Sequence, residues 1–338
     1  GNMRGGRGMG QGTGGWGRNN GITTSWMGGV NGAFTLFDGD MDLAGNYLYN
    51  GNKKDVEEYK KKITYRPDGS HLISDSDKPG ISTTLSQGHR FGVRLEHKFS
   101  ENTSILFEPQ FNFGSGHFNE ISDFNTATRA KGATVEQKET DGYNRNHGAN
   151  DNWSTSGFLL LRQRLGKAGR TISANIRYSF SNNRLDGFNQ SETRKFQEGL
   201  TDIVNQRYNQ KSNSSSLSGR LVYTEPIAKN LFLEANYSYS WNRNHSQKST
   251  YNSGSDTVYV YNEYLERNVL EYIVKDERPD LIYSNEITNL SQNHRAGVNF
   301  SYQLKKFRAQ LGASVNPTIT HNETTGHEPY DNKVVNWS

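Results

Sequence analysis

The stretch LFLEANYSYSW, residues 231–241, decides the fold class of this chain of 338 residues. Every second residue from Leu231 to Trp241 is apolar or aromatic, and the residues between them after Phe232 are Glu234, Asn236, Ser238 and Ser240. A period of two predicts a β-strand with one apolar and one polar face. A soluble sheet turns the apolar face toward a core, whereas a membrane barrel turns it toward lipid. This strand alone fits both arrangements.

The composition is too polar for one large core and too aromatic for a disordered chain. Hydrophobic residues make up 32% of the chain and the mean hydropathy is -0.89, but aromatic residues reach 12%. Disordered chains are depleted in aromatic residues, so part of this chain is structured. No run approaches the roughly 18 consecutive apolar residues of a spanning helix. The absence of cysteine excludes disulfides, and the net charge of +4 gives weak support for an anionic partner.

The same alternation recurs along the chain and predicts five hairpins. Tight turns are expected near residues 39, 102, 167, 228 and 306, each flanked by two strands. The connections between hairpins are far longer, roughly 30 to 50 residues rich in Asn, Ser, Gly, Lys and Asp. Short turns on one rim and long loops on the other are typical of outer-membrane barrels. We therefore predict an all-β fold, an antiparallel up-and-down meander of about ten strands that forms part of a transmembrane β-barrel.

Strand length and the positions of aromatic residues agree with a membrane span. The segment from Leu231 to Trp241, tilted by about 45°, rises roughly 25 Å, the height of a barrel's lipid-facing band. Aromatic residues also gather where the two membrane interfaces should lie. The girdle at the long-loop end is expected to comprise Tyr47, Tyr49, Phe111, Phe113, Tyr178, Phe180, Tyr239 and Trp241. Near the tight turns lie Phe37, Phe99, Tyr223 and Tyr302.

The distribution of charge indicates which face meets lipid. Arg or Lys at mid-bilayer on the lipid face costs about 2 to 4 kcal/mol, so that face must be almost free of charge. The apolar faces of the predicted strands carry no charged residue apart from His97. The opposite faces are expected to line a wet lumen through Arg94, Glu96, Lys98, Glu108, Gln110, Arg162, Arg164, Arg177 and Glu234. Their plainer role is cross-strand charge pairing that stabilises the wall.

Three stretches together resemble a known family. A glycine-rich lead, GGRGMGQGTGGWGRNNGIT (5–23), is followed by LAGNYLYN (43–50) and then by GHRFGVRLEHKFSENTSILFEPQFNF (88–113). This order is similar to the mid-barrel region of TonB-dependent-receptor-like outer-membrane β-barrel proteins. The resemblance implies location in the cell outer membrane, contact with its lipid, and a receptor or transporter that captures a nutrient. It also implies a plug and an energising inner-membrane complex as partners in the intact protein.

The resemblance sets an expectation for domain organisation. Members of that family have about 22 strands and a plug, whereas about ten strands and no plug are recognised here. We therefore expect a piece of a larger barrel. Residues 1–21 are expected to be a Gly-rich lead, residues 22–318 the barrel segment, and residues 319–338 a loop at a truncated end.

Several motifs suggest other chemistry but lack the context it needs. GQGTGG, residues 10–15, lacks the strand before it and the helix after it that a dinucleotide site requires. RGGRG, residues 4–8, has no following basic stripe with aromatic stacking positions, so no nucleic-acid partner is expected. Asp38, Asp40 and Asp42 have EF-hand spacing, but position 49 is Tyr49, so a hairpin turn is expected.

No enzyme activity and no cofactor are expected either. The nine histidines are scattered, and no H-E-x-x-H pair occurs. Asp141, His147 and Asp151 could form a hydrolytic group, although residues of this kind in a loop are more often solvated surface. The alternative function is a secreted or surface-exposed soluble β protein that binds glycan or protein through its loops.

Two segments within the long connections have patterns of their own. NKKDVEEYKKKI, residues 52–63, suits either a short helix or an extension of the preceding strand. DTVYVYNEYLERNVLEYIV, residues 256–274, is more apolar and favours an extra hairpin within the longest loop.

Overall fold

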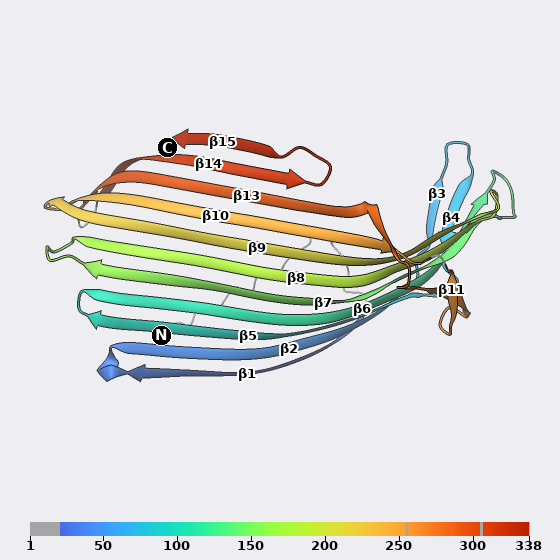
Figure 1. Cartoon of the computed structure of the whole chain (residues 1–338), viewed down its shortest axis with the longest axis horizontal. Coiled ribbons are helices and arrows are strands. Elements are labelled where there is room, and N and C mark those ends of the chain that lie inside the picture. The colour runs from blue at the N-terminus through green and yellow to red at the C-terminus, as the bar shows by residue number, and fades with distance from the viewer. Residues whose placement is uncertain (1–20, 255, 305–306, 338) are drawn as a thin grey trace.

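The computed structural model describes residues 21–254, 256–304 and 307–337. These residues form one antiparallel sheet of 13 strands and a separate two-stranded hairpin (Figure 1). The strands of the main path, in chain order, are β1 (Ile22–Leu36), β2 (Met41–Glu58), β5 (Gly80–Ser100), β6 (Thr103–Arg129), β7 (Gln137–Arg164), β8 (Thr171–Lys195), β9 (Leu200–Ala228), β10 (Leu231–Asn252), β13 (Arg278–Gln303), β14 (Arg308–Thr324) and β15 (Tyr330–Trp337). The predicted all-β antiparallel meander is confirmed.

The sheet is open within the described residues. β1 pairs only with β2, and β15 pairs only with β14, so these two strands form the edges. Figure 1 shows them on opposite sides of the molecule. The path therefore runs from one edge to the other without returning to its start.

The segment 319–338 corrects one sequence prediction, because a loop was expected there. β14 continues to Thr324, and β15 adds an eleventh strand to the path by pairing with β14 from Val315 to Asn322. The sequence pattern did not predict β15, because Asp331 and Lys333 lie on the same face of this strand as Trp337 and interrupt the alternation of apolar and polar residues.

The tight turns lie where the alternation placed them. Strand pairs are joined by the short 3-10 turn η1 (Phe37–Gly39), by residues 101–102, by residues 165–170 and by residues 229–230. Gly39 and Gly169 have φ values of 98° and 87°, a backbone region that favours glycine. Asp38 and Asp40 thus belong to a hairpin turn, as expected, whereas Asp42 already lies in β2, opposite Thr35. The fifth turn includes residues 305–306, which lie outside the described residues.

The connections at the opposite rim are mostly strand rather than loop. β6 to β9 contain 27, 28, 25 and 29 residues, more than twice the roughly 11 that cross a membrane. They therefore continue into a long projection, visible at the right of Figure 1. The sequence did not predict these extensions of the strands, because both faces of the strands become largely polar there. Backbone pairing with long neighbours maintains them without any apolar alternation.

Two of the connections carry additional hairpins. The first is formed by β3 (Lys62–Tyr65) and β4 (His71–Asp75), and β4 also pairs with β6. Residues 52–58 extend β2 and residues 62–63 begin β3, so the segment NKKDVEEYKKKI continues the preceding strand and forms no helix. The second hairpin is formed by β11 (Val258–Asn262) and β12 (Arg267–Glu271), as the sequence predicted.

Aromatic rings lie over glycines of the neighbouring strand. Tyr178 faces Gly157 in register, and a Cβ added to Gly157 would lie 2.4 Å from Cε1 of the Tyr178 ring. A Cβ on Gly187 would likewise lie 2.5 Å from the ring of its partner Tyr208. Because glycine has no side chain, each ring can lie flat over the backbone of the neighbouring strand, and this packing helps to fix the register of the two strands.

This packing predicts a difference between two alanine variants. The added methyl group of Gly157→Ala would displace the Tyr178 ring. In Gly219→Ala, on the same face, the added Cβ would lie 4.0 Å from its nearest atom and would displace nothing. Both substitutions remove the same backbone freedom, so that contribution cancels. Gly157→Ala should therefore be less stable than Gly219→Ala by about 1 to 3 kcal/mol. Urea unfolding in detergent micelles, followed by tryptophan fluorescence, measures the difference, and equal midpoints would contradict the packing.

Candidate functional site

One face of the sheet carries an apolar row that crosses all the strands of the path. Following the register from strand to strand, each residue is the direct partner of the next. The row is apolar apart from His97 and consists of Leu36, Met41, His97, Ile105, Leu161, Ala174, Leu221, Tyr237, Ala296, Val315 and Trp337. The side of each strand that carries this row is called the apolar face below.

The described residues place no core behind the apolar face. Phe34, Phe91, Leu311 and Phe300 lie on it and remain 65%, 43%, 76% and 47% exposed. The buried hydrophobic residues in the described part of the chain are Ile73, Ile121, Tyr143, Leu265, Val269 and Leu270, all in the projection and its hairpins. The apolar stripes of the path strands are therefore not pressed against a second sheet.

The predicted aromatic girdle lies on this apolar face. All eight of its residues share the face with Leu161 and Leu221 through the strand register. The structure adds Trp153, which pairs with Phe113, and two histidines that the sequence analysis missed. The Nδ1 atoms of His89 and His294 lie 2.8 and 2.9 Å from the hydroxyls of Tyr47 and Tyr237. Since the histidines interrupt the aromatic pattern, only the cross-strand partners reveal them as part of the girdle.

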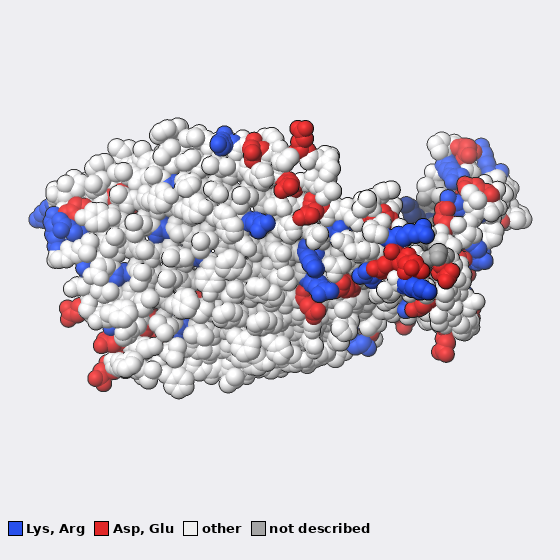
Figure 2. All heavy atoms as spheres, viewed as in Figure 1, with Lys and Arg blue, Asp and Glu red and all other residues white. Residues whose placement is uncertain are grey.

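The apolar face ends abruptly beyond the girdle. The row Tyr49, His89, Phe113 and Trp153 is followed, one step further along each strand, by a polar row. That row consists of Gly51, Gln87, Ser115, Asp151, Arg184, Lys211 and Gln247. Figure 2 shows few charged side chains over the broad part of the face in view, and many over the projection. Aromatic residues thus mark the boundary between an apolar and a charged zone.

The nine candidate lumen residues all lie on the opposite, polar face. The register places Arg94, Glu96 and Lys98 of β5 on the same side as the candidates of β6, β7, β8 and β10. Arg94 forms ion pairs with Glu96 at 2.8 Å and with Glu108, and Glu234 lies 3.8 Å from Arg220. The guanidinium of Arg177 lies over the ring of Phe158, 4.8 Å from its centroid. That this face lines an aqueous interior stays a prediction.

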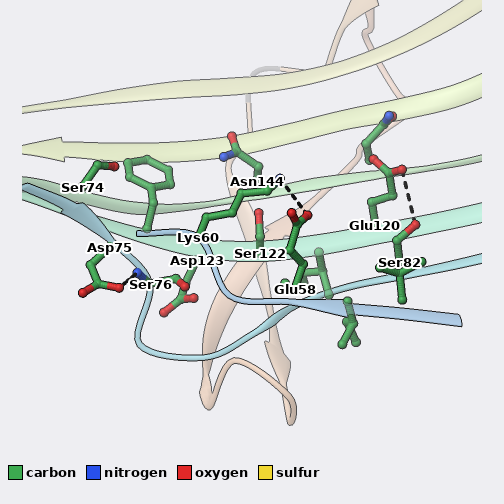
Figure 3. Close-up of a pocket in the computed structure, with 16 residues that line it drawn as sticks. Glu58, Lys60, Ser74, Asp75, Ser76, Ser82, Glu120, Ser122, Asp123 and Asn144 are labelled. Atoms are coloured by element: carbon green, nitrogen blue, oxygen red, sulfur yellow. Dashed lines mark hydrogen bonds and ion pairs between the residues drawn. The ribbon is translucent and has the colours of Figure 1, made fainter. Parts of the chain in front are cut away.

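A polar hollow of about 550 Å³ opens on the same side at the base of the projection. Figure 3 shows acidic, hydroxyl and amide side chains from β2, β4, β5, β6 and β7 converging on it. Glu58 pairs with Lys60 at 3.3 Å, and Ser82 donates to Glu120 at 3.4 Å. These groups could hydrogen-bond a polar ligand, but much of their capacity is already used within the wall.

The β11–β12 hairpin covers the other side of the projection. It leaves the sheet between β10 and β13 but packs on Ile121 of β6 and Tyr143 of β7, which are not neighbours of those strands. The side-chain amide of Gln190 donates to the carbonyl of Leu270 at 2.8 Å. The ammonium of Lys78 donates to the carbonyl of Tyr264, also at 2.8 Å. The hairpin therefore ties together strands that the sheet itself leaves apart.

Tyr143 lies at the centre of the contact between the β11–β12 hairpin and the sheet. It is fully buried, and its hydroxyl accepts a hydrogen bond of 2.6 Å from the backbone N–H of Leu270. Burial raises the pKa of Tyr143 to about 12. The hydroxyl thus stays neutral and serves as a fixed partner for a buried amide.

The structure separates the three residues that could have formed a hydrolytic group. Asp141, His147 and Asp151 lie on one face of β7, but six and four positions apart, or about 20 and 13 Å along the strand. Asp141 forms an ion pair with Arg194 at 2.7 Å; although burial opposes ionisation, Lys138 and Arg194 hold its pKa below the usual value. His147 stacks on Phe188, and burial, reinforced by Arg145, lowers its pKa. No shared site results.

Two further findings concern the described residues. They bring together no group of three or more His, Cys, Asp or Glu side chains that could hold a metal ion. They also include no helix with the length and apolar character to span a membrane. The motifs at residues 4–8 and 10–15 lie outside the described part of the chain.

Comparisons with known proteins identify no family. No protein-family model matches the chain, and no curated protein matches it. Among solved structures, the crystal structure of Acinetobacter baumannii OccAB4 aligns with 95% of this chain and 100% of that chain. The identity is 5% and the TM-score 0.14, so this likeness carries no argument about fold or function.

The hairpin cover generates a prediction about Tyr143→Phe. The variant removes the acceptor for the buried Leu270 amide, which costs about 1 to 3 kcal/mol. Hydrogen exchange should show faster opening of residues 264–271, with the main sheet unchanged. Tyr261→Phe is the matched control, because Tyr261 lies in the same hairpin and is 60% exposed. Equal exchange in both variants would refute the role of the Tyr143 hydroxyl.

Proposed function

We propose that this sheet forms part of the wall of an outer-membrane β-barrel that serves as a receptor or transporter. The observation that carries the proposal is the exposed apolar row, which crosses every strand of the path without a core behind it. Soluble monomers rarely expose contiguous apolar patches larger than a few hundred Å². Lipid provides the apolar surroundings that such a face requires, and barrels of this kind are apolar outside and polar inside.

The aromatic boundary supports the same proposal. Tyr and Trp are enriched at both membrane interfaces, where their rings lie in the apolar layer and their polar groups reach water. The girdle residues occupy the step between the apolar face and the charged row that contains Asp151 and Arg184. The projection, with its hairpins, then stands outside the membrane, where a receptor would meet its ligand.

The more specific part of the proposal rests on the sequence resemblance. The order of the three stretches within residues 5–113 favours a TonB-dependent type of receptor that captures a nutrient. Such a receptor would work with a plug and an energising inner-membrane complex. The polar face would then either line the route of the nutrient or hold the plug.

A pair of adjacent substitutions on β7 tests the orientation. Leu159 lies on the apolar face between Phe107 and Ile176, whereas Leu160 lies on the polar face between Leu106 and Asn175. Leu159→Arg should destabilise the chain folded in lipid by about 2 to 4 kcal/mol, because a charge would face hydrocarbon. Leu160→Arg should cost much less, because the added charge reaches water.

Urea titration of protein reconstituted in lipid vesicles measures both variants, and vesicle flotation shows whether each one inserts. Equal losses would contradict the proposed orientation. A wild-type chain that stays a folded monomer in plain buffer and does not float with vesicles would overturn the membrane proposal. That outcome would favour the soluble β protein that binds glycan or protein.

A further inference from the structure

The polar face carries a surplus of positive charge between the girdle and the tight turns. The described residues place nine cations there, namely Arg90, Arg94, Lys98, Arg162, Arg164, Arg177, Arg220, Arg295 and Arg308. Only four carboxylates share this region, those of Asp42, Glu96, Glu108 and Glu234. The net charge of the whole chain, +4, does not reveal this concentration on one face.

All four carboxylates are satisfied within the wall. Glu96 and Glu108 bind Arg94, and Glu234 lies beside Arg220. Asp42 accepts a hydrogen bond of 2.9 Å from the Thr35 hydroxyl. The other seven cations have no carboxylate within 4 Å in the described part of the chain. Charge pairing thus explains two of the nine cations and leaves the rest without an internal counterion.

Three of the unpaired cations gather around one hollow at the tight-turn rim. Lys98, Arg162 and Arg164 line a space of about 490 Å³, together with the hydroxyl residues Ser104 and Ser173. The register explains the grouping, because Lys98 pairs with Ser104, Ser104 with Arg162, and Arg162 with Ser173. Cations and hydroxyl groups therefore alternate along one row across four strands.

The wall supplies few competing anions at this hollow. Glu96 and Glu101 also line it. The Glu96 carboxylate binds Arg94 at 2.8 Å, and the Glu101 carboxylate forms no ion pair within the described residues, so three cations face one unpaired carboxylate. Arg164 donates to the backbone carbonyl of Glu101 at 3.4 Å, which leaves its charge uncompensated. Arginine presents a planar fork that binds carboxylate or phosphate through two parallel hydrogen bonds, and lysine adds a compact charge.

We infer that this hollow, the rim cation site, binds a small anion that carries two or more phosphate or carboxylate groups. Lys98, Arg162 and Arg164 provide the charge, and the hydroxyls of Ser104 and Ser173 provide additional hydrogen-bond donors. The inference rests on the proposed function, because it requires the polar face to be reached by water. It deepens that function by naming the chemical class of a solute that the interior would hold.

Calorimetric titration of the full chain, folded in zwitterionic detergent micelles, tests the site with pyrophosphate and citrate as probes. At least one probe should bind, and binding should weaken as salt rises from about 0.1 M to 1 M, because screening becomes much stronger. Arg162→Gln and Arg164→Gln should each weaken binding about tenfold, because each removes a charge-assisted pair. Preference between the two probes separates a phosphate ligand from a carboxylate ligand.

The matched control is Arg220→Gln, on the same face but beside Glu234. It should change affinity by less than about twofold, because that charge is already compensated. Arg162→Lys should restore part of the affinity, because it keeps the charge without the fork. If an arginine variant does not fold, Lys98→Gln and the salt dependence of the wild type still test the site.

Failure to bind either probe would overturn the inference, as would an equal loss in the Arg220→Gln control. A protein that floats with vesicles but binds neither probe would refute the rim cation site alone. A protein that does not enter vesicles at all would refute the proposed function instead. The two failures are therefore distinguishable.

Discussion

The structure depends on one constraint, which is that no part of the described chain covers its apolar face. In most folds the alternation of a strand is resolved by packing against a second layer, and the core then fixes the register. Here the row from Leu36 to Trp337 passes through every strand of the path and stays at the surface. A register slip of one residue would turn the apolar side chains of a strand to the opposite face. An environment that is apolar on one side of the sheet and aqueous on the other would therefore fix the register as well as a core does.

The chain meets different demands along the length of its strands. Within the band bounded by aromatic residues, the two faces differ strongly, and ion pairs such as Arg94–Glu108 are confined to the polar face. Beyond the girdle both faces are largely polar, and the few apolar residues there, such as Ile121 and Tyr143, pack against a hairpin. The β11–β12 hairpin buries Tyr143 and Leu270 and so creates the small core that the rest of the sheet lacks. The projection is thus stabilised by protein contacts, whereas the described residues provide no such core for the band.

The sequence predicted the two faces of these strands well, because the alternation that separates them is a local feature. Alternation over residues 231–241 places each side chain on a face, and the eight girdle residues and nine polar-face candidates all lie where that parity puts them. The sequence could not reveal features that depend on cross-strand partners. The long extensions of β6 to β9 have no apolar period, and β15 has mixed faces. Likewise, His89 and Trp153 become recognisable as girdle residues only beside Tyr47 and Phe113. The surplus of unpaired cations could not be predicted from the sequence either, because only the strand register shows which carboxylate lies beside which arginine.

The central claim is that the two faces of each band strand meet different solvents. The most direct measurement is a nitroxide scan of residues 231–241 in lipid vesicles, since the chain has no cysteine and each single-cysteine variant gives one labelled position. Collision with oxygen, which concentrates in lipid, should peak at the odd positions, and collision with a water-soluble relaxant should peak at the even positions. Odd positions shielded from both reagents would show that the apolar face packs on protein, and would contradict the account.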